Sequence, residues 1–204
     1  MDKTYQGVAV KRGAVRKTAV MGMLSALAFI LMYLEIQIPI MPAFIKFDFS
    51  DLPALIGAFS LGPIAGIIIE LVKNLLHATV SGSGMVGELS NFLLSASFVG
   101  IAGAIYKFKP TKIGAIVGTF LGAVIMAAVS FPINNFIVYP IYYNLMSKEA
   151  ILKTYQAIRP SVSSIQECLL VFNVPFTFAK GIIDAAIMFA LYKYVTPLIK
   201  RDNM

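Results

Sequence analysis

The stretch NVPFTFAKGIIDAAIMFALY, residues 173–192, decides the fold class, because it is apolar enough for a membrane helix and yet carries two charged residues. Its length matches the roughly 20 residues that cross a bilayer. Lys180 and Asp184 stand four residues apart, so they share one helical face, where each could neutralise the other. Ionisable groups inside a membrane helix are costly unless they face the interior of a bundle, so this pair also marks a candidate functional site.

The composition of the whole chain agrees with a membrane protein. Of its 204 residues, 58% are hydrophobic and only 13% are charged, and the mean hydropathy is +0.81. A soluble domain of this size cannot bury so much apolar surface. The first apolar run follows a basic segment and continues past signal-peptide length without a small-residue cleavage site, so we expect it to be retained as a membrane helix. The sequence therefore predicts an all-α integral membrane protein.

Apolar runs and helix breakers predict six transmembrane helices in a compact bundle that forms a single membrane domain, residues 1–204. Leu61-Gly62-Pro63 divides one run into two helices. Pro132 and Pro140 are expected to kink the long fifth helix. The expected helices cover about 17–38, 51–61, 63–79, 86–107, 111–146 and 165–197, and residues 35–50 form an outer loop.

The distribution of basic residues predicts the orientation of this bundle. With the amino terminus inside, 11 of the 17 Lys and Arg residues lie on the inner side and four lie outside, while Lys73 and Lys180 lie within helices. Basic residues accumulate in cytoplasmic loops, so we expect both termini to be cytoplasmic in a multi-pass protein of the cell membrane. This orientation accounts for the net charge of +7. No aromatic-interleaved basic patch suggests nucleic-acid binding.

Motifs typical of soluble and membrane enzymes are missing from the sequence. There is no GxxxxGK[ST] phosphate loop, no HExxH metal motif and no GxSxG nucleophile elbow. His77 has no second histidine with which to build a metal site, and Cys168 cannot form an internal disulfide. We therefore expect no enzymatic activity, no metal and no cofactor.

Polar residues at helical spacing indicate where a site lies. Glu70 and Lys73 are three residues apart on one helix, and we expect them to form an internal salt bridge. Asn173, Thr177 and Lys180 form a stripe of hydrogen-bonding groups, which is more than one buried ion pair requires. We expect this stripe to line a polar cavity.

Amides on two other helices point to the same cavity. Asn91 follows Glu88 by three residues, and Asn134 and Asn135 come soon after Pro132. An amide both donates and accepts hydrogen bonds, which suits a neutral ligand with mixed polar edges. Packing between helices is the alternative for any single asparagine. Three helices that present such groups together favour a pocket.

The loop EIQIPIMPAFIKFDFSDLPALIG, residues 35–57, is rich in proline and aromatic residues and is predicted to be ordered on the outer face. Phe44 and Phe47 could cover a planar ring, although anchoring of aromatics at the membrane interface explains them equally well. We expect the outer loop 35–50 to cover the ligand, and Asp48 joins Phe44 and Phe47 as a candidate contact.

Four segments resemble one transporter family in their order and spacing. They are KFDFSDLPALIGAFSLGPIAGIIIELVKNLLH (46–77), GELSNFLL (87–94), NNFIVYPIY (134–142) and VPFTFAKG (174–181). From about residue 16 to 193 the chain is similar to the riboflavin-specific substrate-binding subunit, or S component, of the energy-coupling factor vitamin transporters. The resemblance implies a prokaryotic plasma-membrane protein that captures riboflavin from the outside. A scaffold subunit and two cytoplasmic ATPases would then drive its release inward.

The resemblance also assigns roles to individual residues. Asn134 and Lys180 match the asparagine and the lysine with which the family binds flavin. The family usually has an asparagine three residues before that lysine, in a motif written NxxKG, whereas this chain has Thr177. Asn173, one turn earlier, is a candidate to compensate. Glu88 and Asn91 correspond to contacts with the ribityl chain of riboflavin.

A stripe of small residues on the first helix is a candidate partner interface. Thr18, Gly22 and Ala26 recur every four residues, so another helix can approach closely along them. Packing within the same bundle is the alternative. In the family that the chain resembles, such a stripe docks the scaffold subunit.

Two other functions stay open on the sequence alone. The chain could be an S component for a different vitamin. It could also be a proton-coupled secondary carrier in which Glu70, Lys73, Lys180 and Asp184 relay protons. Secondary carriers usually contain inverted repeats, and we find no internal repeat in this sequence.

Overall fold

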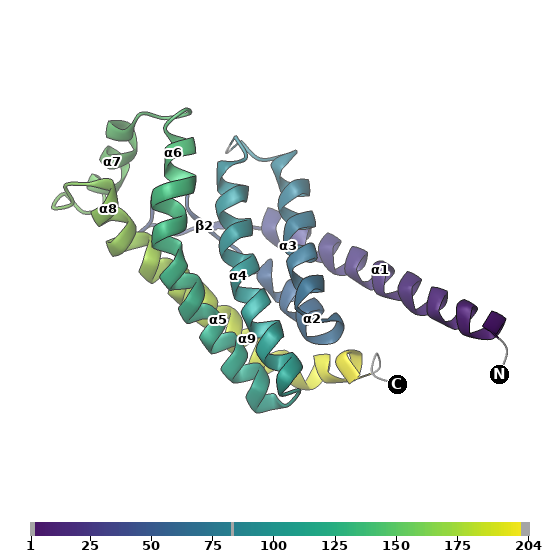
Figure 1. Cartoon of the computed structure of the whole chain (residues 1–204). Coiled ribbons are helices and arrows are strands. Elements are labelled where there is room, and N and C mark those ends of the chain that lie inside the picture. Colours follow the sequence, from purple (N-terminus) through teal and green to yellow (C-terminus); the bar gives the residue numbers. More distant parts are fainter. Residues whose placement is uncertain (1–2, 83, 201–204) are drawn as a thin grey trace.

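The computed structural model describes residues 3–82 and 84–200, with side chains described for 13–82, 84–191 and 193–194. The described chain is helical apart from a short hairpin near its start (Figure 1). The first part comprises α1 (Lys3–Tyr33), β1 (Ile36–Gln37), β2 (Lys46–Phe47), α2 (Asp51–Leu61), α3 (Pro63–Ala78) and α4 (Val86–Phe108). The second part comprises α5 (Lys112–Ile133), the π-helical turn η1 (Asn134–Val138), α6 (Tyr139–Tyr142), α7 (Lys148–Gln156), α8 (Ile165–Cys168), the π-helical turn η2 (Leu169–Asn173) and α9 (Val174–Lys200).

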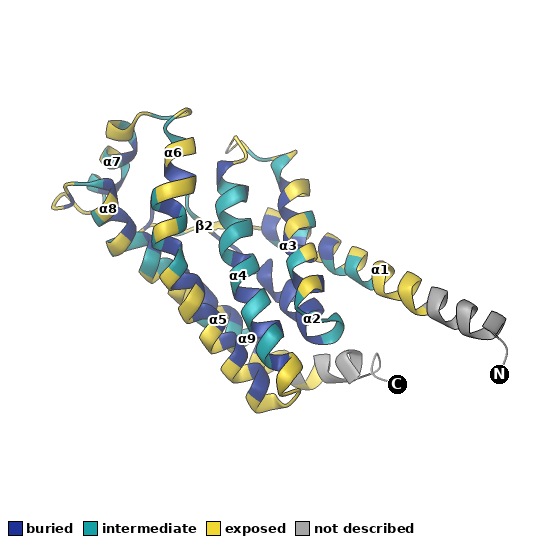
Figure 2. Cartoon of the chain, in the orientation of Figure 1, coloured by how far each residue is buried: buried dark blue, intermediate teal, exposed yellow. Residues whose placement is uncertain are grey.

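Four helical stretches among the described residues are long and apolar enough to cross a membrane. They are Gly13–Tyr33, Val86–Phe108, Lys112–Tyr142 and Ile165–Leu191. The helices α2 and α3 are shorter, with 11 and 16 residues. Large apolar side chains such as Met23, Ile64 and Phe136 are exposed, at 72–73% of their surface. Such faces are typical of a protein whose outer surface meets lipid, and Figure 2 shows them along α1 and α5.

The loop that follows α1 is partly extended. The helix ends at Tyr33, before the expected boundary at residue 38, and β1 pairs antiparallel with β2 so that Ile36 lies opposite Phe47. The sequence EIQIPI explains the early end, because β-branched residues alternate with polar ones and Pro39 holds its neighbour in an extended conformation. A salt bridge between Lys46 and Glu35 closes the base of this hairpin.

A sharp break separates α2 from α3. Gly62 has a φ of 106°, which side chains with a Cβ rarely adopt, and Pro63 begins the next helix, where its missing N–H costs nothing. The break lets α2 and α3 pack against each other and against α4 (Figure 1).

Two π-helical turns, η1 and η2, interrupt the long helical stretches Lys112–Tyr142 and Ile165–Leu191. The turn η1 begins two residues after Pro132, and Pro140 lies two residues beyond its end. The turn η2 is likewise followed by Pro175, two residues beyond its end. A proline lacks the N–H that a regular helical ladder requires. The helix expected at 111–146 ends earlier, at Tyr142. The sequence interpretation also lacked the short helix α7. Ser147 caps this helix by accepting a hydrogen bond from the Ala150 N–H at 3.2 Å.

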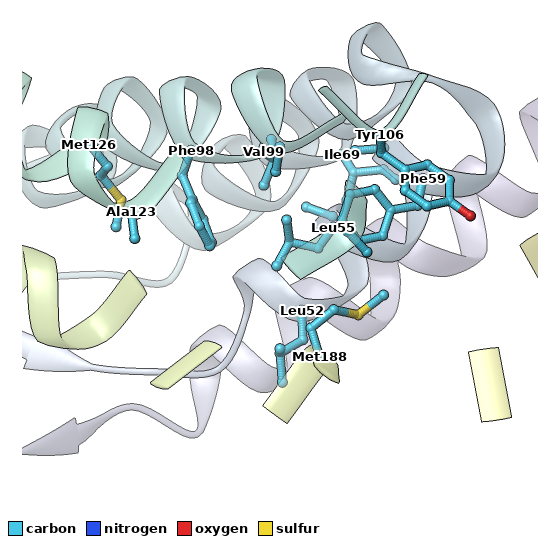
Figure 3. Close-up of a cluster of buried hydrophobic side chains, with 14 of the residues drawn as sticks. Leu52, Leu55, Phe59, Ile69, Phe98, Val99, Tyr106, Ala123, Met126 and Met188 are labelled. Atoms are coloured by element: carbon cyan, nitrogen blue, oxygen red, sulfur yellow. The ribbon is translucent and has the colours of Figure 1, made fainter. Parts of the chain in front are cut away.

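The main apolar core lies between α2, α3, α4, α5 and α9. Phe98, Leu55 and Ile69 are fully buried there, and Figure 3 shows the cluster around them. The helix α5 approaches α4 closely at two glycines: a Cβ on Gly118 or Gly122 would lie 2.8 Å from a backbone carbonyl oxygen of α4. This close packing holds the ends of α4, α5 and α9 in fixed positions around the hairpin.

Candidate functional site

A cavity lined by both apolar and polar side chains lies where the hairpin segment meets α4, the turn η1 and the start of α9. Its volume is about 140 Å³. Six of the nine ligand-binding residues expected from the sequence line it: Phe44, Asn91, Asn134, Asn173, Thr177 and Lys180. Residues from three helices and the outer loop therefore meet at one place, although they are separated by up to 136 positions along the chain.

The π-helical turn η1 brings Asn134 to the cavity. Asn134 is only 3% exposed. Its Nδ2 donates to the Ser130 carbonyl oxygen at 2.8 Å, and its Oδ1 accepts a hydrogen bond from the Ser90 hydroxyl at 3.1 Å. These two contacts hold the amide in one orientation at the cavity wall. Asn135, the next residue, is not among the lining residues.

Asn173 belongs to a second buried network. Its Oδ1 accepts a hydrogen bond from the Tyr155 hydroxyl at 2.7 Å, and its Nδ2 donates to the Tyr139 hydroxyl at 3.3 Å. The two tyrosine hydroxyls also hydrogen-bond to each other. Burial raises the pKa of the Tyr155 hydroxyl well above its ordinary value. The phenol therefore stays protonated and donates at neutral pH.

Lys180 is held by carboxylates from outside its own helix. Its Nζ lies 3.1 Å from Asp48 Oδ2 and 3.3 Å from Asp51 Oδ2. The expectation that Asp184 is its partner is therefore wrong in geometry: among the described residues, neither oxygen of Asp184 has a hydrogen-bond partner or a salt bridge. The reason is the hairpin, which brings Asp48 and the start of α2 onto α9.

A second buried ammonium lies beside the first. Lys73 Nζ is 2.7 Å from Glu70 Oε2, so the expected pair on α3 is present. The same nitrogen also donates to Asp51 Oδ1 and to the Ser50 hydroxyl, each at 2.6 Å. Asp51 thus links Lys73 and Lys180.

Three expected ligand contacts lie beside the cavity rather than in its wall. Glu88 pairs with Nδ1 of His77 at 2.8 Å, and both residues line a neighbouring pocket of about 650 Å³ together with Asp48. This pocket shares Phe44 and Asn91 with the cavity.

Phe47, the last of the three expected contacts outside the cavity wall, lies at a third pocket. Phe47 packs edge-on against Phe176 with ring centroids 6.4 Å apart, and it lines an apolar groove of about 580 Å³ along α9. Phe176 and Lys180 line both the groove and the cavity, so they form the wall between the two.

The cavity has further lining residues that the sequence interpretation did not single out. They include Ser90, Met126, Tyr139, Tyr142 and Phe176. Tyr139 and Tyr142 are three residues apart, a spacing that could have indicated a shared face. The contact between Phe44 and Tyr142, with ring centroids 5.4 Å apart, joins the outer loop to α6. Nothing in the local sequence marks Met126 or Ser90.

The small-residue stripe on α1 is free on the surface. Thr18, Gly22 and Ala26 are all exposed, and a Cβ on Gly22 would meet nothing within 4 Å. On the same helix, the neighbouring Ser25 and Ala28 are buried against the bundle. Packing within this chain therefore does not explain the stripe.

No metal centre is found in the part of the chain with described side chains. None of its His, Cys, Asp and Glu residues form a group of three or more that could hold a metal ion. The polar groups of the cavity are amides, hydroxyls and paired charges, which suit hydrogen bonding to an uncharged molecule.

Comparisons with known proteins agree on one family. Residues 16–192 match the family described as "ECF transporter, substrate-specific component". The chain is 36% identical to the riboflavin transporter RibU of Staphylococcus aureus strain TCH60 over 186 residues, which cover 91% of this chain and 93% of that protein. It is 30% identical to the riboflavin transporter FmnP of Bacillus subtilis strain 168 over 192 residues, covering 93% and 96%. A solved structure of the S component of a bacterial ECF transporter is similar with a TM-score of 0.73 and 33% identity, covering 92% of this chain and 99% of that one.

Proposed function

Because the chain belongs to the family of ECF transporter substrate-specific components, we propose that it is the riboflavin-binding subunit of such a transporter. Two relatives of nearly full length are riboflavin transporters. The chain is accordingly a transport component and not an enzyme. The observation that carries the proposal is the convergence of Asn134, Asn173 and Lys180 on one cavity beneath an aromatic loop.

The chemistry of riboflavin fits these groups. Its pyrimidine edge offers one donor and two acceptors, its ribityl chain offers hydroxyls, and its dimethylbenzene edge is apolar. Asn134 supplies both a donor and an acceptor, and Lys180 supplies donors. Phe44 and Tyr142 supply aromatic surface for the ring system. The other candidate contacts, Asn91, Glu88, Asp48, Phe47 and Thr177, surround these groups.

We propose that the outer loop moves when the ligand binds, and the small volume of the cavity supports this. Pockets for ligands of this size measure about 300–1,000 Å³. The cavity alone measures about 140 Å³, whereas the pocket that shares Phe44 and Asn91 with it measures about 650 Å³. Riboflavin would therefore occupy both compartments and displace the side chains between them, with residues 35–50 as its cover.

The proposed membrane arrangement has six crossings and both termini in the cytoplasm. In this arrangement α2 and α3 complete the bundle as short crossings beside the four long spans. The α3–α4 connection and residues 143–164 then lie at the outer face, where riboflavin enters (Figure 1), and Phe44 of the outer loop contacts Tyr142 beside them. The basic turn between α4 and α5 lies inside, in agreement with the positive-inside rule. A scaffold subunit and two ATPases complete the transporter in the cell membrane.

Flavin binding by the purified chain tests this function. We expect the protein, purified in detergent from cells that contain riboflavin, to be yellow and to quench the fluorescence of the bound flavin. Titration of the flavin-free protein should give saturable quenching by riboflavin at one site per chain. A colourless protein that quenches no added riboflavin, or that binds another vitamin instead, would refute the proposal.

The free stripe on α1 gives a prediction about the scaffold partner. Gly22→Leu is expected to abolish ATP-driven riboflavin uptake in cells that contain the other subunits, because the larger side chain prevents close helix approach. Riboflavin binding by the isolated variant should stay at the wild-type level, since a Cβ at Gly22 touches nothing in this chain. Uptake at the wild-type rate would remove the stripe from the partner interface.

A further inference from the structure

A cluster of six buried charged side chains lies next to the cavity. Asp48 comes from the loop after β2, Asp51 from α2, Glu70 and Lys73 from α3, and Lys180 and Asp184 from α9. None of the six is more than 6% exposed. The cluster contains four carboxyl groups and two ammonium groups, so full ionisation would leave two uncompensated negative charges inside the membrane-embedded bundle.

The hydrogen bonds indicate which two carboxyl groups carry the compensating negative charges. Asp51 contacts both ammonium groups, and Asp48 contacts Lys180 while its Oδ1 accepts a hydrogen bond from the Ser50 N–H at 2.8 Å. Glu70 contacts only Lys73, at 2.7 Å, and neither of its oxygens has a hydrogen-bond partner. Asp184 is 0% exposed and neither of its oxygens has a hydrogen-bond partner. The charged groups that act on it electrostatically are Asp48, Asp51, Lys73 and Lys180. An ionised carboxylate without partners in such surroundings is prohibitively costly.

We propose that Asp184 is a proton-binding site, and that its proton is released when the outer loop opens. In the closed state, Asp48 and Asp51 balance the two lysines, and Asp184 and Glu70 are neutral acids. When the loop withdraws, Asp48 leaves Lys180 and enters water. The Asp184 carboxyl then loses its proton to solvent, and its carboxylate replaces Asp48 as a counter-ion for Lys180, one helical turn away.

The sign of the resulting pH dependence follows from the proton count. The closed state holds one proton more than the open state, so a lower pH favours closure of the loop. This step rests on the proposed function, because closure over riboflavin is what links the proton to affinity. Riboflavin affinity should therefore fall as the pH rises, with a limit of about tenfold per pH unit for one linked proton.

Two measurements on the full chain in detergent test the proposal. The first is infrared absorption without flavin, where the carbonyl stretch of protonated carboxylic acids should be present in the wild type and weaker in Asp184→Asn, which keeps the contribution of Glu70 and lacks that of Asp184. The second is riboflavin titration across a series of pH values. Asp184→Asn, which mimics the neutral acid, should bind with the same affinity at every pH. Glu149→Gln removes an exposed carboxylate at the start of α7 and should keep the wild-type pH dependence.

A second variant keeps the test decisive. Without the charge of Asp48, Lys180 needs Asp184 as its counter-ion in both states, so Asp48→Asn should also remove the pH dependence. An unchanged slope in Asp184→Asn, a flat wild-type profile, or no weakening of the acid band in Asp184→Asn would overturn the proposal. If riboflavin fails to bind at any pH, the proposed function fails, and the infrared comparison still decides whether Asp184 holds a proton.

Discussion

Lys180→Met is expected to weaken riboflavin binding by about 1–3 kcal/mol, because a buried acceptor of the ligand loses its donor. The same change leaves the Asp48 carboxylate without the ammonium at 3.1 Å that holds the outer loop closed. Both effects act in the same direction. Titration of the purified protein by flavin fluorescence should show the dissociation constant rising roughly 5- to 150-fold.

A matched variant separates this effect from a general loss of charge. Lys109→Met removes an exposed ammonium at the turn between α4 and α5 and should bind riboflavin like the wild type. Lys180→Arg keeps the charge near Asp48 and Asp51, so it should bind more tightly than Lys180→Met. Equal affinity of Lys180→Met and the wild type would exclude Lys180 from the ligand site.

Lys73→Met is expected to lower the stability of the fold by about 3–5 kcal/mol, the usual cost of removing one partner from a buried ion pair. Lys73 is completely buried and contacts Asp51, Glu70 and Ser50 at 2.6–2.7 Å. Its loss leaves the carboxylate of Asp51 with Lys180 as its remaining ionic contact. Thermal unfolding in detergent should show a clearly lower midpoint than that of the wild type.

Companion variants identify the cause of that loss. The double variant Lys73→Met, Asp51→Asn also removes the uncompensated carboxylate of Asp51, so it should recover part of the lost stability. Glu70→Gln should cost much less than Lys73→Met, because an amide replaces an acid that we propose to be neutral. If Lys73→Met unfolds at the wild-type temperature, the cluster contributes little to the fold.

Much of this architecture could be predicted because it depends on local patterns. Long apolar runs define the helices, and the spacing of Asn173, Thr177 and Lys180 places them on one face of the continuous stretch formed by η2 and α9, which does line the cavity. The family assignment came from short segments whose order and spacing resemble one transporter family. It is confirmed by the family match over residues 16–192.

The partner of Lys180 could not be predicted in the same way. The rule for residues four apart on a helix pointed to Asp184, but Asp48, which is 132 positions away, provides the hydrogen bond. A hairpin of four paired residues brings it there, and pairing between such short strands depends on tertiary packing rather than on propensity. The contact of Glu88 with His77 of α3 could not be predicted either, because it is not visible from the sequence of α4 alone.

Because of the two π-helical turns, the number of residues in a helix, as well as their identity, determines which groups face the ligand. Each turn holds one residue more than a regular helix would, and Asn134 and Asn173 lie within them. Deleting a single residue from either turn would restore regular winding and leave the helices on both sides in register, so that only the residues of the turn itself would change direction. A lineage could thus exchange the groups that face its vitamin by gaining or losing one codon, while the packed half of the bundle stays as it was.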